Sequence, residues 1–140
     1  MRKIILILLA IGVIGAGIGY YMVNKPVPSL EKKKADLEVT AAKLLTDYQL
    51  NETAANETYL GKLVLVSGKV VDITQENGIK KIHLETPNPM SLIICELETG
   101  MEIGELKPGE EAKIKGSCTG YQSIGDMGDV ILVQSTLVKE

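Results

Sequence analysis

An apolar run extends from Leu60 to Ile73, with Gly68 near its centre. Residues 63–66 are apolar at every position, so neither face of an extended strand there suits water. Gly68 removes a side chain where a strand can bend or bulge to serve two parts of a sheet. We predict that residues 60–73 form the bent first strand of a small β-barrel, with one face in the core and the other covered.

A helix is predicted to cover that outer face. From residue 37 onward, apolar side chains recur at helical spacing, and Thr40 is a suitable amino-terminal cap. The stripe consists of Leu37, Ala41, Leu44, Leu45 and Tyr48. We expect this helix to pack on the outer face of residues 63–66. Residues 51–59 predict a second short helix that leads into the strand.

Four further strands are predicted after the first. Asn77-Gly78 is a tight hairpin signal, and Ile82 and Leu84 of the following strand should point inward. The strands are expected at residues 79–86, 91–97, 111–121 and 130–138, with a short helix or turn at 98–106. Three strands, a connection and two strands are the order of the five-stranded Greek-key OB barrel. The predicted fold class is mainly β, an OB-like barrel over residues 37–140 with a covering helix at its amino end.

The amino end predicts a membrane segment. Residues 4–23 carry no charge and no proline, and they match the roughly 20 residues that cross a bilayer as a helix. Tyr20 and Tyr21 suit the aromatic belt at a membrane interface. A cleaved signal peptide is the alternative, because it would share the basic start Arg2-Lys3. Residues 24–36 contain Pro26 and Pro28, which oppose a helix, and are predicted as a stalk or linker.

Charge is distributed unevenly along the chain. Six of the fifteen basic residues but only one of the eighteen acids precede Ala35, so the remainder carries nine bases, seventeen acids and a net charge of −8. The basic residues before the span favour residues 1–3 as a cytoplasmic tip and place the barrel on the other side. An acidic domain repels a phosphate backbone unless its lysines are gathered in one place.

The chain resembles the tRNA_anti-like family of OB-fold domains, which occur in membrane-attached or exported proteins of Bacteroidetes-type bacteria. The resemblance is carried by residues 40–45, 51–55, 59–62 and 66–70, by Cys95, by the turn at 106–109, and by residues 114–120. It covers nearly everything after Ala35. The resemblance implies a bacterial inner-membrane protein with its OB domain on the periplasmic side, or a periplasmic protein if the amino end is cleaved. It does not imply a ligand.

A ligand face would use the few basic and aromatic residues of the strands. Lys80, Lys81, His83 and Tyr121 are the candidates. Nucleic-acid binding by an OB fold needs stacking rings and a basic groove, and the second and third strands offer no ring beyond the histidine. A tyrosine at a strand end is more often a packing residue. The chain is therefore predicted to be a non-catalytic binding or assembly module for a protein or small ligand, with oligonucleotide binding as the alternative.

Two cysteines, Cys95 and Cys118, are expected to face the core. In an oxidising compartment they could form a disulfide worth on the order of 3 kcal/mol. The alternative is two buried thiols that act as small hydrophobes. In the usual barrel order their strands are not neighbours, so a bond would have to cross the interior.

Catalytic and metal sites are not predicted. His83 is the single histidine, so a hydrolytic triad or a zinc site would have to use it, and nothing near it has ligand spacing. Asp126 and Asp129 could hold calcium, but the ligand order of a recognised calcium loop is missing and an ordinary turn is favoured. No cofactor is expected, and an enzyme remains a remote alternative.

Overall fold

Six strands form one closed sheet in the computed structural model, which describes residues 2–24 and 30–138. In chain order they are β1 (Leu37–Thr40), β2 (Leu63–Glu76), β3 (Ile79–Leu84), β4 (Ile93–Leu97), β5 (Glu111–Ile124) and β6 (Met127–Val138). They lie in the order β1-β2-β3-β4-β6-β5, and β2 also pairs with β5. Without β1 this is the five-stranded Greek-key order of the OB fold. The predicted fold class is confirmed.

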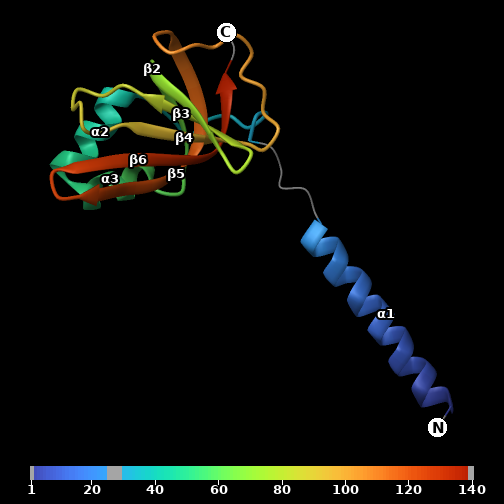
Figure 1. Ribbon diagram of the computed structural model, residues 1–140. Helices are drawn as coiled ribbons and strands as arrows, with labels where there is room; N and C mark the ends of the chain where they lie inside the picture. Colours follow the sequence, from blue (N-terminus) through green and yellow to red (C-terminus); the bar gives the residue numbers. More distant parts are fainter. Residues whose placement is uncertain (1, 25–29, 139–140) are drawn as a thin grey trace.

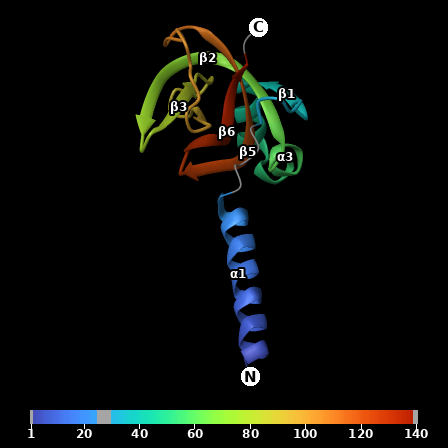
Figure 2. The same cartoon turned by 90° about the vertical axis from the view of Figure 1, so that its right-hand side faces the viewer.

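Strand β2 bends because it serves both halves of the barrel. Residues 63–69 pair with β5, whereas residues 70–76 pair with β3, and Figure 2 shows the strong curvature between the two parts. Gly68 lies just before this change of partner. A Cβ there would be 3.0 Å from the Cβ of Ala41 and 3.5 Å from that of Leu84. The residue is glycine because the chain passes close by, and the ladder irregularity itself falls between Val70 and Asp72.

Two helices precede β2. Helix α2 (Ala41–Leu50) begins after Thr40, whose hydroxyl accepts a hydrogen bond from the Lys43 N–H at 3.2 Å, as the sequence predicts. Helix α3 (Glu52–Tyr59) is capped in the same way by Asn51. Leu37 is not helical. It belongs to β1, which pairs in parallel with β2, because the backbone groups at that edge of β2 accept a strand before the helix begins.

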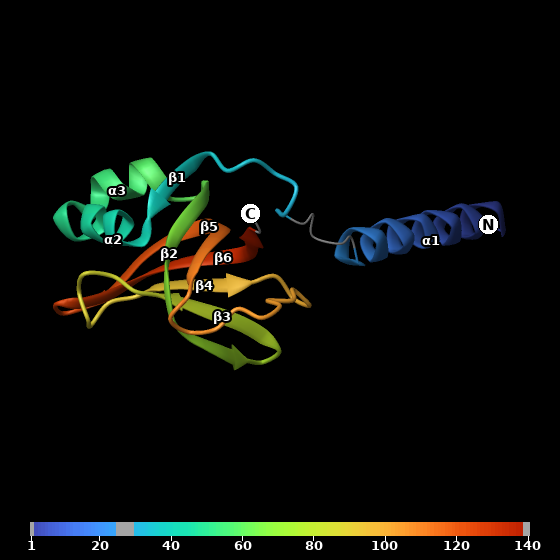
Figure 3. The same ribbon diagram turned by 90° about the horizontal axis from the view of Figure 1, so that it is seen from above.

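Helix α2 packs on the inner side of the barrel, and the prediction that it covers the outer face of β2 is wrong. Leu44, Leu45 and Tyr48 belong to the same core as Val64 and Val66, the inward residues of β2. Both helices lie at the end of the barrel remote from α1 (Figures 1 and 3). The apolar stripe is used to close one end of the barrel, because the core there is otherwise open.

The remaining strands have the predicted faces. Ile82 and Leu84 are fully buried, and the Asn77-Gly78 hairpin has positive φ at both residues, 51° and 80°, as a tight primed turn requires. Residues 98–106 form turns rather than a helix. The strand ends differ from the predicted ones by a few residues.

Helix α1 (Arg2–Asn24) has no buried residue and lies apart from the barrel (Figure 1). The helix has 23 residues, and an 18-residue window within it has a mean hydropathy of 2.3, which is sufficient to cross a membrane; an amino-terminal signal sequence also passes this test. Part of the predicted cytoplasmic tip (Met1), part of the predicted stalk (residues 25–29) and the last two residues lie outside the described part of the chain.

Residues 30–36, which the sequence predicts as stalk, lie against the barrel; we call them the strap. The Nζ of Lys115 donates to the carbonyl oxygens of Glu31 at 2.7 Å and Lys33 at 2.6 Å. These bonds bury Lys115 on the outward face of β5, where only 8% of the residue is exposed.

The two ends of the strap are also fixed. The Leu30 N–H donates to Glu98 Oε1 at 2.8 Å. Asp36 and Leu63 exchange two hydrogen bonds: the Asp36 N–H donates to the Leu63 carbonyl at 2.7 Å, and Asp36 Oδ2 accepts from the Leu63 N–H at 3.0 Å. The strap, and not the helix, therefore lies beside the outer face of β2.

Candidate functional site

The predicted ligand residues on β3 do not all share one face. Lys81 lies on the outer face, where its Nζ contacts Glu76 at 3.1 Å and Glu96 at 3.3 Å. Hydrogen bonds with these two carboxylates raise the pKa of Lys81. Its charge is thus already balanced by two acids. Lys80 has the opposite strand parity, and its Nζ lies 3.7 Å from Glu102.

His83 shares the outer face with Lys81 and contacts a threonine of β2 there. Its Nε2 lies 3.2 Å from the hydroxyl of Thr74, and which atom donates depends on the ring tautomer. In the described ranges 2–24 and 30–138, no group of three His, Cys, Asp or Glu side chains could hold a metal ion. Asp129, considered for calcium, accepts a hydrogen bond from the Leu92 N–H at 2.7 Å.

Tyr121 lies away from β3, in a cluster of three tyrosines at the helical end of the barrel. Its ring stacks on Tyr48 with centroids 5.8 Å apart, and Tyr48 lies 6.0 Å from Tyr59. The register of β5 shifts between Cys118 and Gly120, and this shift turns Tyr121 toward the core. The structure therefore brings Lys81 and His83 together and leaves Tyr121 as a packing residue.

The hydroxyls of this cluster are hydrogen bonded. Tyr59 donates to Asp47 Oδ2 at 2.6 Å, and burial together with this bond raises the pKa of Tyr59 to about 12. Burial alone would raise the pKa of Asp47, but hydrogen bonds from Lys43 and Tyr59 hold it below its usual value. Burial, with a contact of 3.5 Å to the Cys118 sulfur, also raises the pKa of Tyr48. These bonds tie α2 to α3 and to β5.

Cys95 and Cys118 are buried free thiols, so the disulfide that the sequence left open is not formed. Both residues are register partners of Leu132, one on each side of β6. With a strand between them, their Cα atoms are separated by about 9 to 10 Å, whereas a disulfide needs less than about 7 Å. Burial raises the pKa of Cys95 well above its ordinary value.

A hollow of about 420 Å³ lies on the outer face of β3, β4 and β6, and we call it the outer groove. It is lined by Ile79, Glu96, Leu97, Glu98, Thr99, Val133 and Gln134. β3 and β4 are the second and third strands of the five-stranded barrel, whose face binds ligands in OB folds, and β6 lies next to β4. Two carboxylates, an amide and aliphatic side chains suit a ligand that is cationic and partly apolar.

A β-bulge shapes the outer groove. Cys95 pairs with Leu132 and Leu97 pairs with Ser135, so Glu96 on β4 faces two residues of β6. One of these, Gln134, has φ of +50°, in the left-handed region that non-glycine residues rarely adopt. Bulges and such backbone conformations concentrate at binding sites, where they redirect side chains. The outer groove is therefore the strongest candidate site of the barrel.

The residue after the bulge is also unusual. Ser135 is fully buried, and among the described residues its hydroxyl is a buried side-chain oxygen without a hydrogen-bond partner. It lies over Gly116 of β5, where a Cβ would overlap the Ser135 Oγ. A strained backbone and an unpaired hydroxyl at adjacent positions indicate a region that is not optimised for stability alone.

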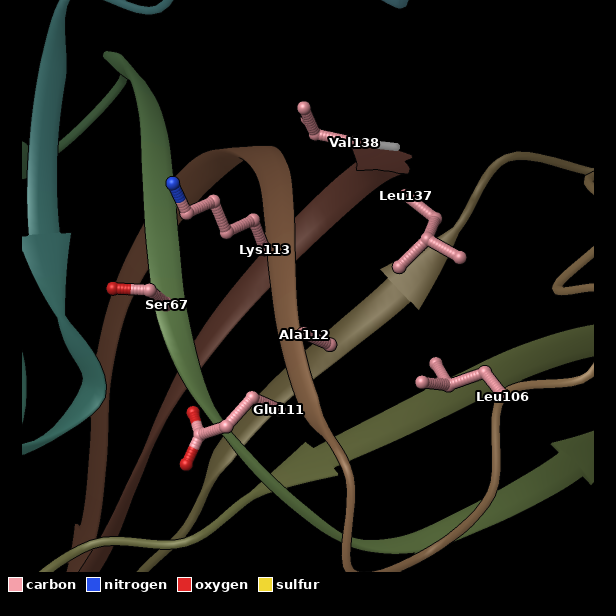
Figure 4. Close-up of a pocket in the computed structure, with 7 residues that line it drawn as sticks. All are labelled: Ser67, Leu106, Glu111, Ala112, Lys113, Leu137 and Val138. Atoms are coloured by element: carbon pink, nitrogen blue, oxygen red, sulfur yellow. The ribbon is translucent and has the colours of Figure 1, made fainter. Parts of the chain in front are cut away.

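A second hollow, about 300 Å³, lies at the mouth of the barrel near the end of β6. Figure 4 shows its side chains on opposite sides of β5: Leu106, Ala112 and Leu137 on one, and Ser67, Glu111 and Lys113 on the other. The polar side chains therefore do not point into the same space as the apolar ones. This hollow lacks the arrangement expected of a binding site.

The family model tRNA_anti-like matches residues 1–136, which include both α1 and the barrel. The chain belongs to the tRNA_anti-like family. The resemblance noted from the sequence is confirmed. No curated protein matches the sequence.

Solved structures similar to this tRNA_anti-like protein include a lipoprotein of Klebsiella pneumoniae subsp. pneumoniae MGH 78578, described as a suspected nucleic acid-binding protein. It is 23% identical, covers 74% of this chain and 92% of its own, and has a TM-score of 0.55, a likeness that shows the fold alone. An OBody bound to hen egg-white lysozyme is 15% identical (59% and 87% covered, TM-score 0.43). A protein of Leishmania major Friedlin assigned as an aspartyl-tRNA synthetase is 11% identical (90% and 26% covered, TM-score 0.46).

Proposed function

We propose that this tRNA_anti-like protein is a membrane-anchored, non-catalytic binding module whose outer groove receives a basic segment of another polypeptide. The observation that carries the proposal is the bulge at Gln134, which opens a groove beside Glu96 and Glu98 on the face that OB folds use. Aliphatic walls would contact the stem of a lysine or arginine. Its charge would add to the contacts that Glu96 and Glu98 already make with Lys81 and the Leu30 N–H, because a carboxylate has two oxygens and accepts several hydrogen bonds.

Oligonucleotide binding is the second candidate, favoured by the fold and by the description of the Klebsiella pneumoniae lipoprotein. The outer groove argues against it. Its residues include two carboxylates and no aromatic ring, and nearby Lys81 is already paired with Glu76 and Glu96. Single-stranded nucleic acid needs stacking rings and unpaired basic groups along its path. An enzyme is the remote alternative: His83 contacts the Thr74 hydroxyl, but a base and a hydroxyl form a catalytic triad only when a third group, usually a carboxylate, orients the base.

We further propose that α1 stays uncleaved as a single span in a bacterial inner membrane, with residues 1–3 in the cytoplasm and the barrel outside it. Tyr20 and Tyr21 near the end of α1 support an interfacial anchor over a processing site. The alternative is a periplasmic protein released by cleavage. Protease treatment of right-side-out vesicles should remove the barrel from an intact anchored chain. If the barrel resists the protease in those vesicles and is digested in inverted ones, it lies on the cytoplasmic side and the proposed orientation is wrong.

The test of function uses the full-length protein in bilayer discs of neutral lipid. Labelled single-stranded RNA and DNA, a lysine- and arginine-containing peptide, and an acidic peptide of equal length are titrated at low salt. The basic peptide should bind, and Glu96→Gln should weaken it several-fold while the matched change Glu111→Gln, on an exposed residue of β5, should not. Salt-dependent oligonucleotide binding would support the second candidate, and equal effects of the two variants would refute the outer groove.

A further inference from the structure

The strap carries three consecutive lysines, Lys32, Lys33 and Lys34, and all three are exposed. Asn24, the last residue of α1, is six residues before Leu30, the first residue of the strap. An extended chain covers that separation in about 20 Å at most. With α1 in a bilayer, the lysines are therefore held close to the membrane surface.

The barrel holds the strap in place before any contact is made. Lys115 fixes its first turn through two carbonyl oxygens, and Asp36 fixes its end through two hydrogen bonds with Leu63. A segment that is already ordered loses less conformational entropy when it docks. The strap thus presents its lysines as part of a rigid surface and not as a loose tail.

The acidic groups of this region are turned toward the barrel or engaged. The Asp36 carboxylate accepts from the Leu63 N–H, and the Glu98 carboxylate accepts from the Leu30 N–H. Glu31 is likewise engaged in an interaction. The outward charge of the strap is therefore dominated by its lysines.

We infer that Lys32, Lys33 and Lys34 dock on anionic lipid headgroups and so fix which side of the barrel faces the bilayer. This inference rests on the proposed anchoring of α1 in a membrane. Three lysines at an anionic surface favour the docked orientation by about a hundredfold, an attraction that salt screens. Glu98 both contacts the strap and lines the outer groove, so docking places one end of the outer groove beside the headgroups.

The experiment uses full-length protein in bilayer discs of neutral lipid alone or of neutral lipid with phosphatidylglycerol, each containing a trace of nickel-chelating lipid. A nitroxide is attached at Thr99→Cys, an exposed position next to Glu98; the two native cysteines are buried. Nickel at the bilayer surface should increase the relaxation rate of the nitroxide more in the anionic discs, because docking of the strap brings position 99 closer to the headgroups. Replacing all three strap lysines by glutamine should abolish the difference.

A matched control changes the same amount of charge elsewhere, at the exposed residues Lys62, Lys69 and Lys107, each replaced by glutamine. This control should retain the difference between the discs. Equal relaxation in both discs, or equal effects of the two triple variants, overturns the inference. If the relaxation of the nitroxide depends on the strap lysines but not on the charge of the lipid, the lysines contact protein and not headgroups. This result also overturns the inference. Protein that fails to remain with the discs refutes the anchoring as well, so the two failures are distinguishable.

Discussion

Replacement of the buried Ser135 by alanine should stabilise the barrel. The Ser135 hydroxyl is fully buried and has no partner among the described residues, so folding removes it from water without compensation. An unsatisfied buried polar group costs about 1 to 3 kcal/mol. Alanine removes that cost and gives up only the small packing contribution of one oxygen, so we expect a gain of about 1 kcal/mol. For a domain of this size the melting temperature should rise by about 4 °C.

The neighbouring glycine provides a second measurement of the same contact. A Cβ at Gly116 would overlap the Ser135 Oγ and lie 3.1 Å from the Cβ of Leu132. Gly116→Ala should therefore cost about 1 to 3 kcal/mol through overpacking. In the double variant the Ser135 oxygen is gone, so the cost of Gly116→Ala should fall by about 1 kcal/mol, a coupling typical of residues in contact.

Urea unfolding of the full-length protein in detergent, followed by tyrosine fluorescence, measures all four members of this cycle. The three tyrosines of the cluster at Tyr48 report on the barrel. A loss of stability of more than about 1 kcal/mol in Ser135→Ala would mean that the hydroxyl has a partner. Strictly additive effects would mean that Gly116 and Ser135 do not meet as described.

Three further predictions concern the strap, the tyrosine cluster and the thiols. Lys115→Met should cost about 2 kcal/mol in urea unfolding, because the two carbonyls of the strap lose a charged donor, whereas Lys69→Met, at an exposed site, should change little. Tyr59→Phe should raise the Asp47 pKa toward its ordinary value in an NMR titration. Since the folded pKa of Asp47 is lowered, its contribution to stability is present above the unfolded pKa and lost as pH falls through the folded one, so Tyr59→Phe should be less stable at pH 7 and lose less on acidification. The two cysteines should react with a thiol reagent only after unfolding, and the mass should be the same with and without reductant; a 2 Da difference on reduction would contradict the free thiols.

Features set by neighbouring residues could be predicted from the sequence. The Thr40 cap, the Asn77-Gly78 turn and the inward Ile82 all follow from local hydrogen bonding or strand alternation, and the structure has each of them. The bend of β2 was also predictable, because Gly68 marks the place where another part of the chain approaches.

Features that depend on a distant partner could not be predicted. Leu37 lies at helical spacing from Ala41, but pairing with β2 makes it a strand residue. Lys115 is a charged residue that would suit solvent, and only the strap, more than eighty residues away in sequence, buries it. Tyr121 faces inward because the register of β5 shifts between Cys118 and Gly120. Gly120 lies at the shift with a φ of 110°, but its role depends on the pairing with β6, which the sequence does not reveal.

The outer groove was missed for a related reason. Its bulge places Gln134 at positive φ without a glycine to signal it. A faint signal exists in β6, where the inward residues Leu132 and Ser135 are three positions apart instead of two. Spacing of this kind indicates an extra residue only when the faces of the strand are already known.

The central claim, that the outer groove binds a polypeptide, is tested most directly by photo-crosslinking of the full-length protein in its native membrane. A benzophenone amino acid replaces Val133 in the outer groove or, as the control, Thr58 on α3 at the helical end of the barrel. The account predicts a discrete protein adduct from position 133, none from position 58, and a weaker adduct when Glu96→Gln is added. The same adducts from both positions, or a nuclease-sensitive adduct from position 133, would contradict it.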